Sequence, residues 1–161
     1  MSRHLKRSWT VVVSLVALGV AGCATAPAAR VGSGDVVVDR QRLMKLNGAS
    51  FADIQAKAKA GNIEGVAVNA ETLAINAMHI TALFPPGSLT EKSKAKPEIW
   101  QKWAEFEAAA KNLQAQAEKL RDTARTKDAA ATEAILKDFG RQTCGACHTP
   151  FRVPPPQPPR S

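Results

Sequence analysis

The sequence predicts an all-α protein, an antiparallel four-helix bundle, on the basis of three observations. Apolar residues recur at spacings of three and four in four successive stretches between residues 36 and 151, the period of helices that bury one face. No run in this region alternates apolar and polar residues as a half-buried strand does. Two of the three connections between the stretches are short, which favours antiparallel neighbours. The length of 161 residues fits one such domain.

Residues 1–22 have the organisation of an export signal. Three basic residues precede an apolar run, residues 10–21, that is shorter than the roughly 20 residues needed to span a bilayer. The sequence Val-Ala-Gly-Cys at 20–23 resembles a bacterial lipobox. We therefore expect cleavage before Cys23, lipid on Cys23, and a periplasmic lipoprotein tethered to the membrane. Cleavage within residues 24–29 is the alternative, and it would leave a soluble periplasmic protein.

The first two helices are predicted after a tether. Residues 23–35 are mostly small residues with Pro and Gly, which favours a flexible segment. One helix is predicted over 36–60 and the next over 63–83, because Phe-Pro-Pro-Gly at 84–87 is a strong stop signal. The stripe of the second helix consists of Val66, Ala70, Leu73, Ala77 and Ile80.

The third helix, residues 98–126, has the clearest periodicity in the chain. Pro97 stands at its entrance, where a missing N–H costs nothing. A fourth helix is predicted over 128–151, and residues 153–161 hold five of the ten prolines, so we expect a disordered tail there. The stripe of the third helix consists of Ile99, Trp103, Phe106, Ala110, Leu113, Ala117, Leu120 and Ala124.

The predicted core is short of side-chain bulk. Aromatic residues make up only 5% of the chain, Tyr is absent, and many stripe positions are Ala. Helices with such stripes pack closely over part of their length, and where they splay we expect a cavity that something else fills.

The pentapeptide Cys144-Gly145-Ala146-Cys147-His148 supplies a candidate for that role. C-x-x-C-H is the attachment sequence of c-type haem. On a helix, positions i, i+3 and i+4 share one face, so Cys144 and Cys147 can add to the two vinyl groups of a porphyrin. His148 then lies under the iron as the proximal axial ligand.

Three other interpretations of the cysteine pair were weighed. A zinc site needs two more ligands, and after removal of the signal the only other histidine is His79. A thioredoxin-like redox pair requires a βαβ context that a helical chain lacks. A structural disulfide in a non-haem helical lipoprotein is the remaining alternative in the periplasm. The odd count of three cysteines fits one lipid site plus two haem attachments.

The chain resembles the class II c-type cytochromes, the cytochrome c′ family, over residues 36–152. The resemblance rests on the haem motif in the last helix, Arg152 beyond it, Pro97-Glu98-Ile99-Trp100, and Arg40-Gln41 in the first helix. It implies one covalent haem c with its iron. It also implies that Arg40 and Gln41 reach a haem propionate and that Arg152 lies near the proximal face.

The same resemblance implies the identity of the second axial ligand. Counted from Arg40-Gln41, the distal position falls on Met44, and the surrounding sequence looks like the low-spin cytochrome c556 branch. A His/Met pair raises the reduction potential in electron-transfer cytochromes. If Met44 is only a core side chain, the iron stays five-coordinate and binds nitric oxide or CO. A distal His79 would give a bis-histidine haem.

These inferences predict an exported monohaem cytochrome that passes single electrons between redox partner proteins, as a monomer or a homodimer. The formal net charge is +8, and removal of residues 1–22, with three basic and no acidic residues, leaves +5. No basic patch interleaved with aromatic residues indicates nucleic-acid binding. No catalytic triad or pair of carboxylates stands out, so we do not expect an enzyme. Trp100 and Trp103 are expected to pack against the haem or the core.

Overall fold

The computed structural model describes residues 32–156. The predicted export signal, Cys23, most of the predicted tether, and residues 157–161 of the tail lie outside the described residues. No helix between residues 32 and 156 is long and apolar enough to cross a membrane. In this range the chain forms helices and no strand: α1 (Val36–Lys59), α2 (Ile63–His79), the short 3-10 helix η1 (Thr81–Leu83), α3 (Glu98–Gln101), α4 (Trp103–Arg125), α5 (Ala129–Gly140), the π-helix η2 (Arg141–Gly145) and α6 (Ala146–Phe151).

Polar side chains cap the starts of α1, α2 and α5, whereas α4 has no side-chain cap. Asp35, Asn62 and Asp128 each accept a hydrogen bond from an amide two or three residues further on, at 2.8–2.9 Å, which satisfies a donor that the first helical turn leaves free. Gly61 and Lys127 adopt positive φ angles of 73° and 62° in the two tight turns. These turns reverse the chain between α1 and α2 and between α4 and α5.

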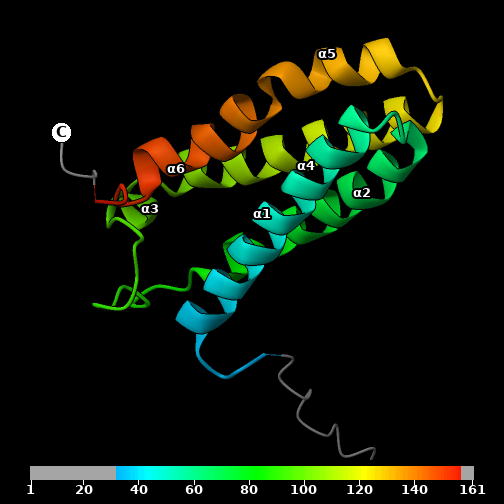
Figure 1. The fold of residues 1–161 in the computed structure, drawn as a ribbon. Helices are drawn as coiled ribbons and strands as arrows, with labels where there is room; N and C mark the ends of the chain where they lie inside the picture. The colour runs from blue at the N-terminus through cyan, green and yellow to red at the C-terminus, as the bar shows by residue number, and fades with distance from the viewer. Residues whose placement is uncertain (1–31, 157–161) are drawn as a thin grey trace, which may run out of the picture. The chain divides into compact units, whose positions relative to one another are not determined.

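Four helices close into a bundle (Figure 1). Each of α1, α2, α4 and α5 packs on the next along the chain, and α5 returns to contact α1. The interface between α2 and α4 is the most extensive of the four. The predicted antiparallel four-helix bundle is therefore confirmed.

The core follows the predicted stripes. All five stripe residues of α2 are buried, and every stripe residue of the third predicted helix is buried except Trp103. The alanines among them are at most 4% exposed, and their small side chains let α2 and α4 approach closely.

The predicted third helix is divided into two, and one expectation about it is wrong. Lys102 has φ −122° and ψ 46°, which ends α3 and starts α4. Trp103 then lies 38% exposed rather than in the bundle interior, and its ring rests against Phe106 with centroids 5.6 Å apart. Trp100 is partly buried against the core, and its indole N–H donates to the carbonyl of Phe84 at 3.1 Å.

The predicted fourth helix also differs from a single α-helix. It starts as α5, passes through the π-helix η2 and ends as α6. Single turns of π-helix inside α-helices occur frequently at functional sites. Because the pentapeptide starts inside η2 and ends in α6, its residues do not keep the α-helical register that their spacing predicts.

Two aromatic rings mark where α1 and α5 meet. Phe51 of α1 stacks on Phe139 of α5 with ring centroids 5.5 Å apart. A Cβ at Gly140 would lie 3.2 Å from Cε1 of Phe51, so glycine permits this close approach. Nearer the start of α1, the helix lies apart from α6 (Figure 1), and the space between them is described below.

We predict that Leu120→Ala strongly destabilises the bundle. Leu120 is fully buried on α4, and such truncations cost about 2–5 kcal/mol through lost burial and the cavity left behind. Leu46→Ala on α1 is the matched control, because Leu46 is 58% exposed and should lose less than about 0.5 kcal/mol. Denaturant unfolding of the haem-loaded protein measures both. Equal losses would contradict the assigned core.

Candidate functional site

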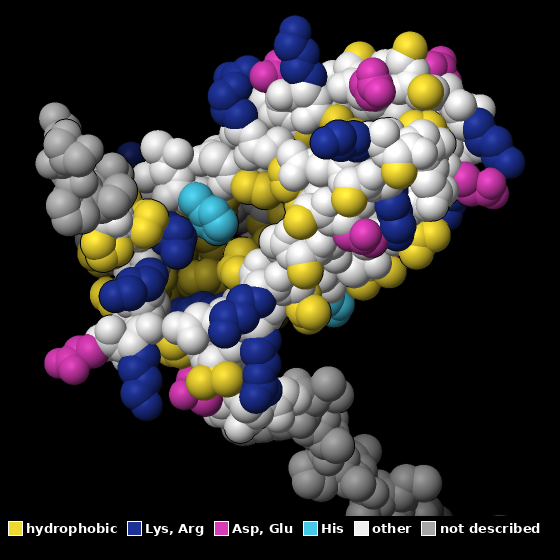
Figure 2. Space-filling model, in the orientation of Figure 1, with side chains coloured by type: hydrophobic (Ala, Val, Ile, Leu, Met, Phe, Trp, Pro, Cys, Tyr) yellow, Lys and Arg dark blue, Asp and Glu magenta, His cyan; other side chains and the backbone are white. Residues whose placement is uncertain are grey.

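A cavity of about 460 Å³ opens at the end of the bundle where α1 and α6 lie apart. Its volume is in the range typical of ligand and cofactor sites. The space-filling view shows it as a hollow with an apolar floor (Figure 2). Side chains from α1, the segment 84–97, α3, α4 and α6 line it, together with Arg152 just after α6. The cavity predicted from the alanine-rich stripes is thus present.

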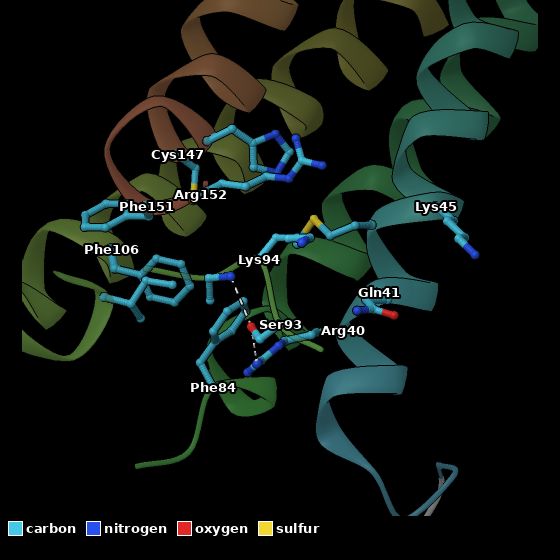
Figure 3. A pocket seen from close by; sticks show the side chains of 14 residues that line it. Arg40, Gln41, Lys45, Phe84, Ser93, Lys94, Phe106, Cys147, Phe151 and Arg152 are labelled. Atoms are coloured by element: carbon cyan, nitrogen blue, oxygen red, sulfur yellow. Dashed lines mark hydrogen bonds between the residues drawn. The ribbon is translucent and has the colours of Figure 1, made fainter. Parts of the chain in front are cut away.

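Aromatic side chains form one wall of the cavity. The ring of Phe106 lies between Phe84 and Phe151, with centroids at 4.8 and 5.5 Å (Figure 3). Ile99 completes this wall from α3. All four side chains are buried, and they present an apolar surface from which water is excluded.

Met44 of α1 and His148 of α6 both line this cavity. They lie more than a hundred residues apart in the sequence, on two helices that the cavity separates. An imidazole nitrogen and a thioether sulfur are the two axial ligands of haem iron in electron-transfer cytochromes. Partial burial, followed by the positive charge of Arg152, lowers the pKa of His148, which favours the neutral imidazole that binds metals.

The two cysteines of the pentapeptide are placed differently. Cys147 lines the cavity, and its burial, with a smaller effect of Cys144, raises its pKa to about 11. Cys144 lies in η2, is half-buried, and is not among the cavity-lining residues; its Sγ is 3.7 Å from the hydroxyl of Thr143. Within residues 32–156 the two cysteines form no disulfide with each other. Residues 32–156 form helices and no strand, so the thioredoxin-like alternative lacks the βαβ context that it requires.

Arg40 anchors the segment 84–97 to α1. Its guanidinium is buried at 4% exposure and donates to the carbonyl of Ser88 and the hydroxyl of Ser93, both at 2.7 Å. It also donates to the hydroxyl of Ser88 at 3.0 Å and lies 4.8 Å from the ring centroid of Phe84. These acceptors are all neutral. Arg40 therefore joins the floor of the cavity to the helix that carries Met44 (Figure 3).

The same segment is tied to the end of α6. The amide of Lys96 donates to the carbonyl of Phe151 at 2.9 Å, and the amide of Val153 donates to the carbonyl of Lys94 at 2.8 Å. Ala95 pairs with Arg152 in an antiparallel bridge. Gln41 adds a bond from its side-chain amide to the carbonyl of Lys92 at 3.0 Å. Residues 84–97, named here the strap, thus connect the Met44 side of the cavity to the His148 side.

The structure brings together most of the predicted site residues. Arg40, Gln41, Met44, Cys147, His148 and Arg152 all line one cavity. His79 is exposed and lies outside it, so the bis-histidine alternative has no support. Among residues 32–156 no cluster of three or more His, Cys, Asp or Glu side chains is arranged to hold a metal ion, which leaves the zinc alternative without a ligand set.

Sequence reasoning missed the contribution of the segment 84–97. Ser93, Lys94 and Ala95 line the cavity, and Ser88 holds Arg40. The available signal was the alternation of Lys92, Lys94 and Lys96 with small residues, which is typical of an extended segment with one face turned inward.

The residues of the cavity fit a haem of the c type. An apolar recess with an aromatic wall suits a porphyrin, nitrogen and sulfur ligands line it from separate helices, and the attachment sequence Cys144-Gly145-Ala146-Cys147-His148 runs along its edge. A four-helix bundle with these features defines the class of c-type haem proteins that carry the attachment motif in the last helix.

Comparison with known proteins gives the family. Residues 35–152 match the family described as Cytochrome C'. The chain is 33% identical to a cytochrome c-556 from Agrobacterium tumefaciens, over 73% of this chain and 96% of that protein, and 29% identical to a cytochrome c' from Rubrivivax gelatinosus, over 74% and 95%. The chain belongs to the cytochrome c′ family, so covalently bound haem c with its iron is its cofactor. The non-haem lipoprotein alternative is thereby excluded.

Solved structures show the same fold. The crystal structure of the Rubrivivax gelatinosus cytochrome c' superimposes with a TM-score of 0.65 at 27% identity, covering 74% of this chain and 96% of that one. A cytochrome c' described as having an unusual ligand-controlled dimer dissociation superimposes with a TM-score of 0.69 at 25% identity, covering 78% and 100%. A nitric oxide complex of a mutant of cytochrome c prime from Alcaligenes xylosoxidans gives a TM-score of 0.65 at 28% identity, covering 74% and 94%.

We predict that Arg40→Met loosens the strap and destabilises the protein by about 2–3 kcal/mol, because it leaves buried acceptors on Ser88 and Ser93 without their charged donor. Arg42→Met is the matched control. Arg42 is exposed and forms only a 3.6 Å ion pair with Asp39, so its loss should change the free energy of unfolding by less than about 0.5 kcal/mol. Thermal unfolding of both haem-loaded variants distinguishes an anchoring Arg40 from an ordinary surface charge.

Proposed function

We propose that this protein is an exported monohaem c-type cytochrome that carries single electrons in the periplasm, with low-spin iron ligated by His148 and Met44. The observation that carries the proposal is the placement of these two side chains on separate helices around one apolar cavity. The similarity to cytochromes c-556 supports the same assignment.

Each part of the site has a role in this proposal. Cys144 and Cys147 hold the cofactor through thioethers and so retain it in either oxidation state. His148 and Met44 would supply an imidazole nitrogen and a thioether sulfur as the two protein ligands of the iron. Bound haem c supplies an iron that alternates between the ferrous and ferric states and carries one electron. The aromatic wall of Phe84, Phe106 and Phe151 excludes water from the buried face, and Arg40 holds the strap beneath it.

The polar residues at the edge have supporting roles. Gln41 and Arg40 lie where they can meet the carboxylates of a bound haem, since both line the cavity from the first turns of α1. Arg152 lies against the His148 side and contributes positive charge near its imidazole. A permanent ligand on each side of the iron leaves no open position for a substrate, so we propose a carrier rather than an enzyme.

Gas binding is the second candidate function. A mutant of a cytochrome c prime of similar fold forms a nitric oxide complex. If Met44 lies off the iron, the distal position is open to nitric oxide or CO. Met44 is only partly buried, so its thioether is held less tightly than a core side chain. The spin state of the oxidised protein separates the two candidates: low-spin iron supports electron transfer, and high-spin iron supports gas binding.

The cellular setting of the proposal depends on the N-terminal residues. An export signal over 1–22 would take the protein to the periplasm, where c-type haem is attached, and lipid on Cys23 would tether it to the membrane. The tether 23–35 would then let the bundle, residues 36–152, reach redox partner proteins.

We predict that Met44→Ala abolishes the far-red methionine-to-iron charge-transfer band of the oxidised protein and makes the iron accessible to CO after reduction. Met78→Ala is the matched control, because Met78 is 61% exposed on α2 and does not line the cavity; its spectrum should equal that of the unaltered protein. Absence of the band from the unaltered protein, together with a high-spin spectrum and rapid CO binding, would show that Met44 is not a ligand.

We also predict that the double variant Cys144→Ala/Cys147→Ala carries no covalent haem. After expression in a host with the c-type maturation machinery, the unaltered protein should stain for haem on a denaturing gel and the double variant should not. Cys23→Ala is the control: it should keep the stain but lose the mass of the lipid and its partition into the membrane fraction. Haem that stays with the double variant through denaturation would contradict the assigned attachment.

A further inference from the structure

The mouth of the cavity carries an uncompensated positive charge. Its lining includes Arg40, Lys45, Lys94 and Arg152 and no acidic side chain. Lys92 lies beside them, because its carbonyl accepts the bond from cavity-lining Gln41. Lys and Arg side chains gather around the hollow in the space-filling view (Figure 2). Four of these residues are exposed and are named here the basic collar: Lys45, Lys92, Lys94 and Arg152.

The collar residues differ from other basic residues on the described surface in whether they form ion pairs. Away from the cavity, basic side chains commonly form ion pairs, as Lys57 does with Asp53 at 2.8 Å and Lys127 with Glu64 at 3.0 Å. Among residues 32–156 the collar residues form no ion pair within 4.0 Å. The nearest acidic residues along the same segments are Glu91 and Asp39, and Asp39 accepts bonds from the amide of Ser33.

The strap explains why these side chains face outward together. Lys92 ends a turn, and beyond it Ser93 turns in to Arg40 and Ala95 packs against the core, while Lys92 and Lys94 are exposed. Lys45 stands on the outer side of α1, and Arg152 lies across the cavity beyond α6 (Figure 3). The positive charges thus surround the opening from both of its sides.

A bound haem would not neutralise the positive charge of the collar. Its two propionates offset two positive charges, whereas the collar together with buried Arg40 supplies five. A ring of one sign around a recess with low-dielectric walls focuses the field and accelerates the encounter with a partner of opposite charge.

We propose that the basic collar docks an acidic electron-transfer protein at the mouth of the cavity, so that electrons enter and leave through the haem edge exposed there. This proposal rests on the proposed function and specifies the chemistry of its partner. The protein class is favoured over an anionic membrane because the charges ring a concave opening, whereas a membrane surface requires a flat or convex basic face.

The test uses the haem-loaded full chain and a plant-type [2Fe–2S] ferredoxin as an acidic one-electron donor, whose potential lies well below that of a His/Met-ligated haem, so that transfer is downhill. One electron leaves the reduced cluster, which is oxidised, and enters the ferric iron of the cytochrome, which is reduced, with no bond made or broken. Stopped-flow absorbance gives the second-order rate constant as a function of ionic strength.

We expect the rate constant of Lys92→Gln/Lys94→Gln to fall about fivefold or more below that of the unaltered protein at about 0.01 M salt. The two should converge at about 1 M salt, where screening removes the field. Lys119→Gln/Lys137→Gln is the matched control. It removes the same charge from exposed residues of α4 and α5 outside the collar, which also form no ion pair within 4.0 Å among residues 32–156. Its rate constant should stay within about twofold of that of the unaltered protein.

Two outcomes would overturn the proposal. Equal rate constants for the collar and control variants would show that only net charge matters. Loss of binding to phosphatidylglycerol vesicles by the collar variant, with an unchanged ferredoxin rate, would assign the collar to a membrane surface instead. The far-red band of the unaltered protein, recorded on the same samples, reports separately on His148/Met44 ligation, so failure of the proposed function is not confused with failure of docking.

Discussion

The structure depends on one packing constraint: the side chains of this bundle cannot fill the end between α1 and α6. Elsewhere in the bundle, alanine stripes let α2 and α4 pack closely, and Phe51 on Phe139 closes α1 against α5. Beyond that stack no bulky residue of α1 reaches α6, so an apolar space remains. A void in a protein interior forfeits dispersion contacts on all its walls, and a rigid planar cofactor restores them. The haem is therefore part of the core as well as the reactive group.

Much of the fold could be predicted because its determinants are local. Helix periodicity and the proline and glycine stop signals predict the four helical stretches, and every residue of the stripe predicted for the second helix is buried. The departures are tertiary in origin. The break at Lys102 and the π-helix before Ala146 lie next to the aromatic wall and the cavity. No residue pattern within those segments predicts them. Exposure of Trp103 follows from the break.

The residues of the candidate site likewise fall into those that the sequence predicts and those that only the tertiary structure reveals. The motif around Cys147 and His148 carries its chemistry in the sequence, and the resemblance to a family located Met44, which lines the same cavity. The role of Arg40 in holding Ser88 and Ser93 was not predictable, because those partners lie more than forty residues away in a segment without secondary structure. The sequence shows the alternating lysines of the strap, but only the fold shows that Lys92 and Lys94 lie around the same opening as Lys45 and Arg152.

The strap also determines when, during synthesis, this end of the molecule becomes complete. Its hydrogen bonds reach back to Arg40 and forward to Phe151 and Val153, so they span almost the whole bundle. The forward partners are synthesised after α1 to α5. The α2–α4 interface is available earlier. The cavity between α1 and α6 is consequently the last part of the described bundle to be completed as the chain is synthesised.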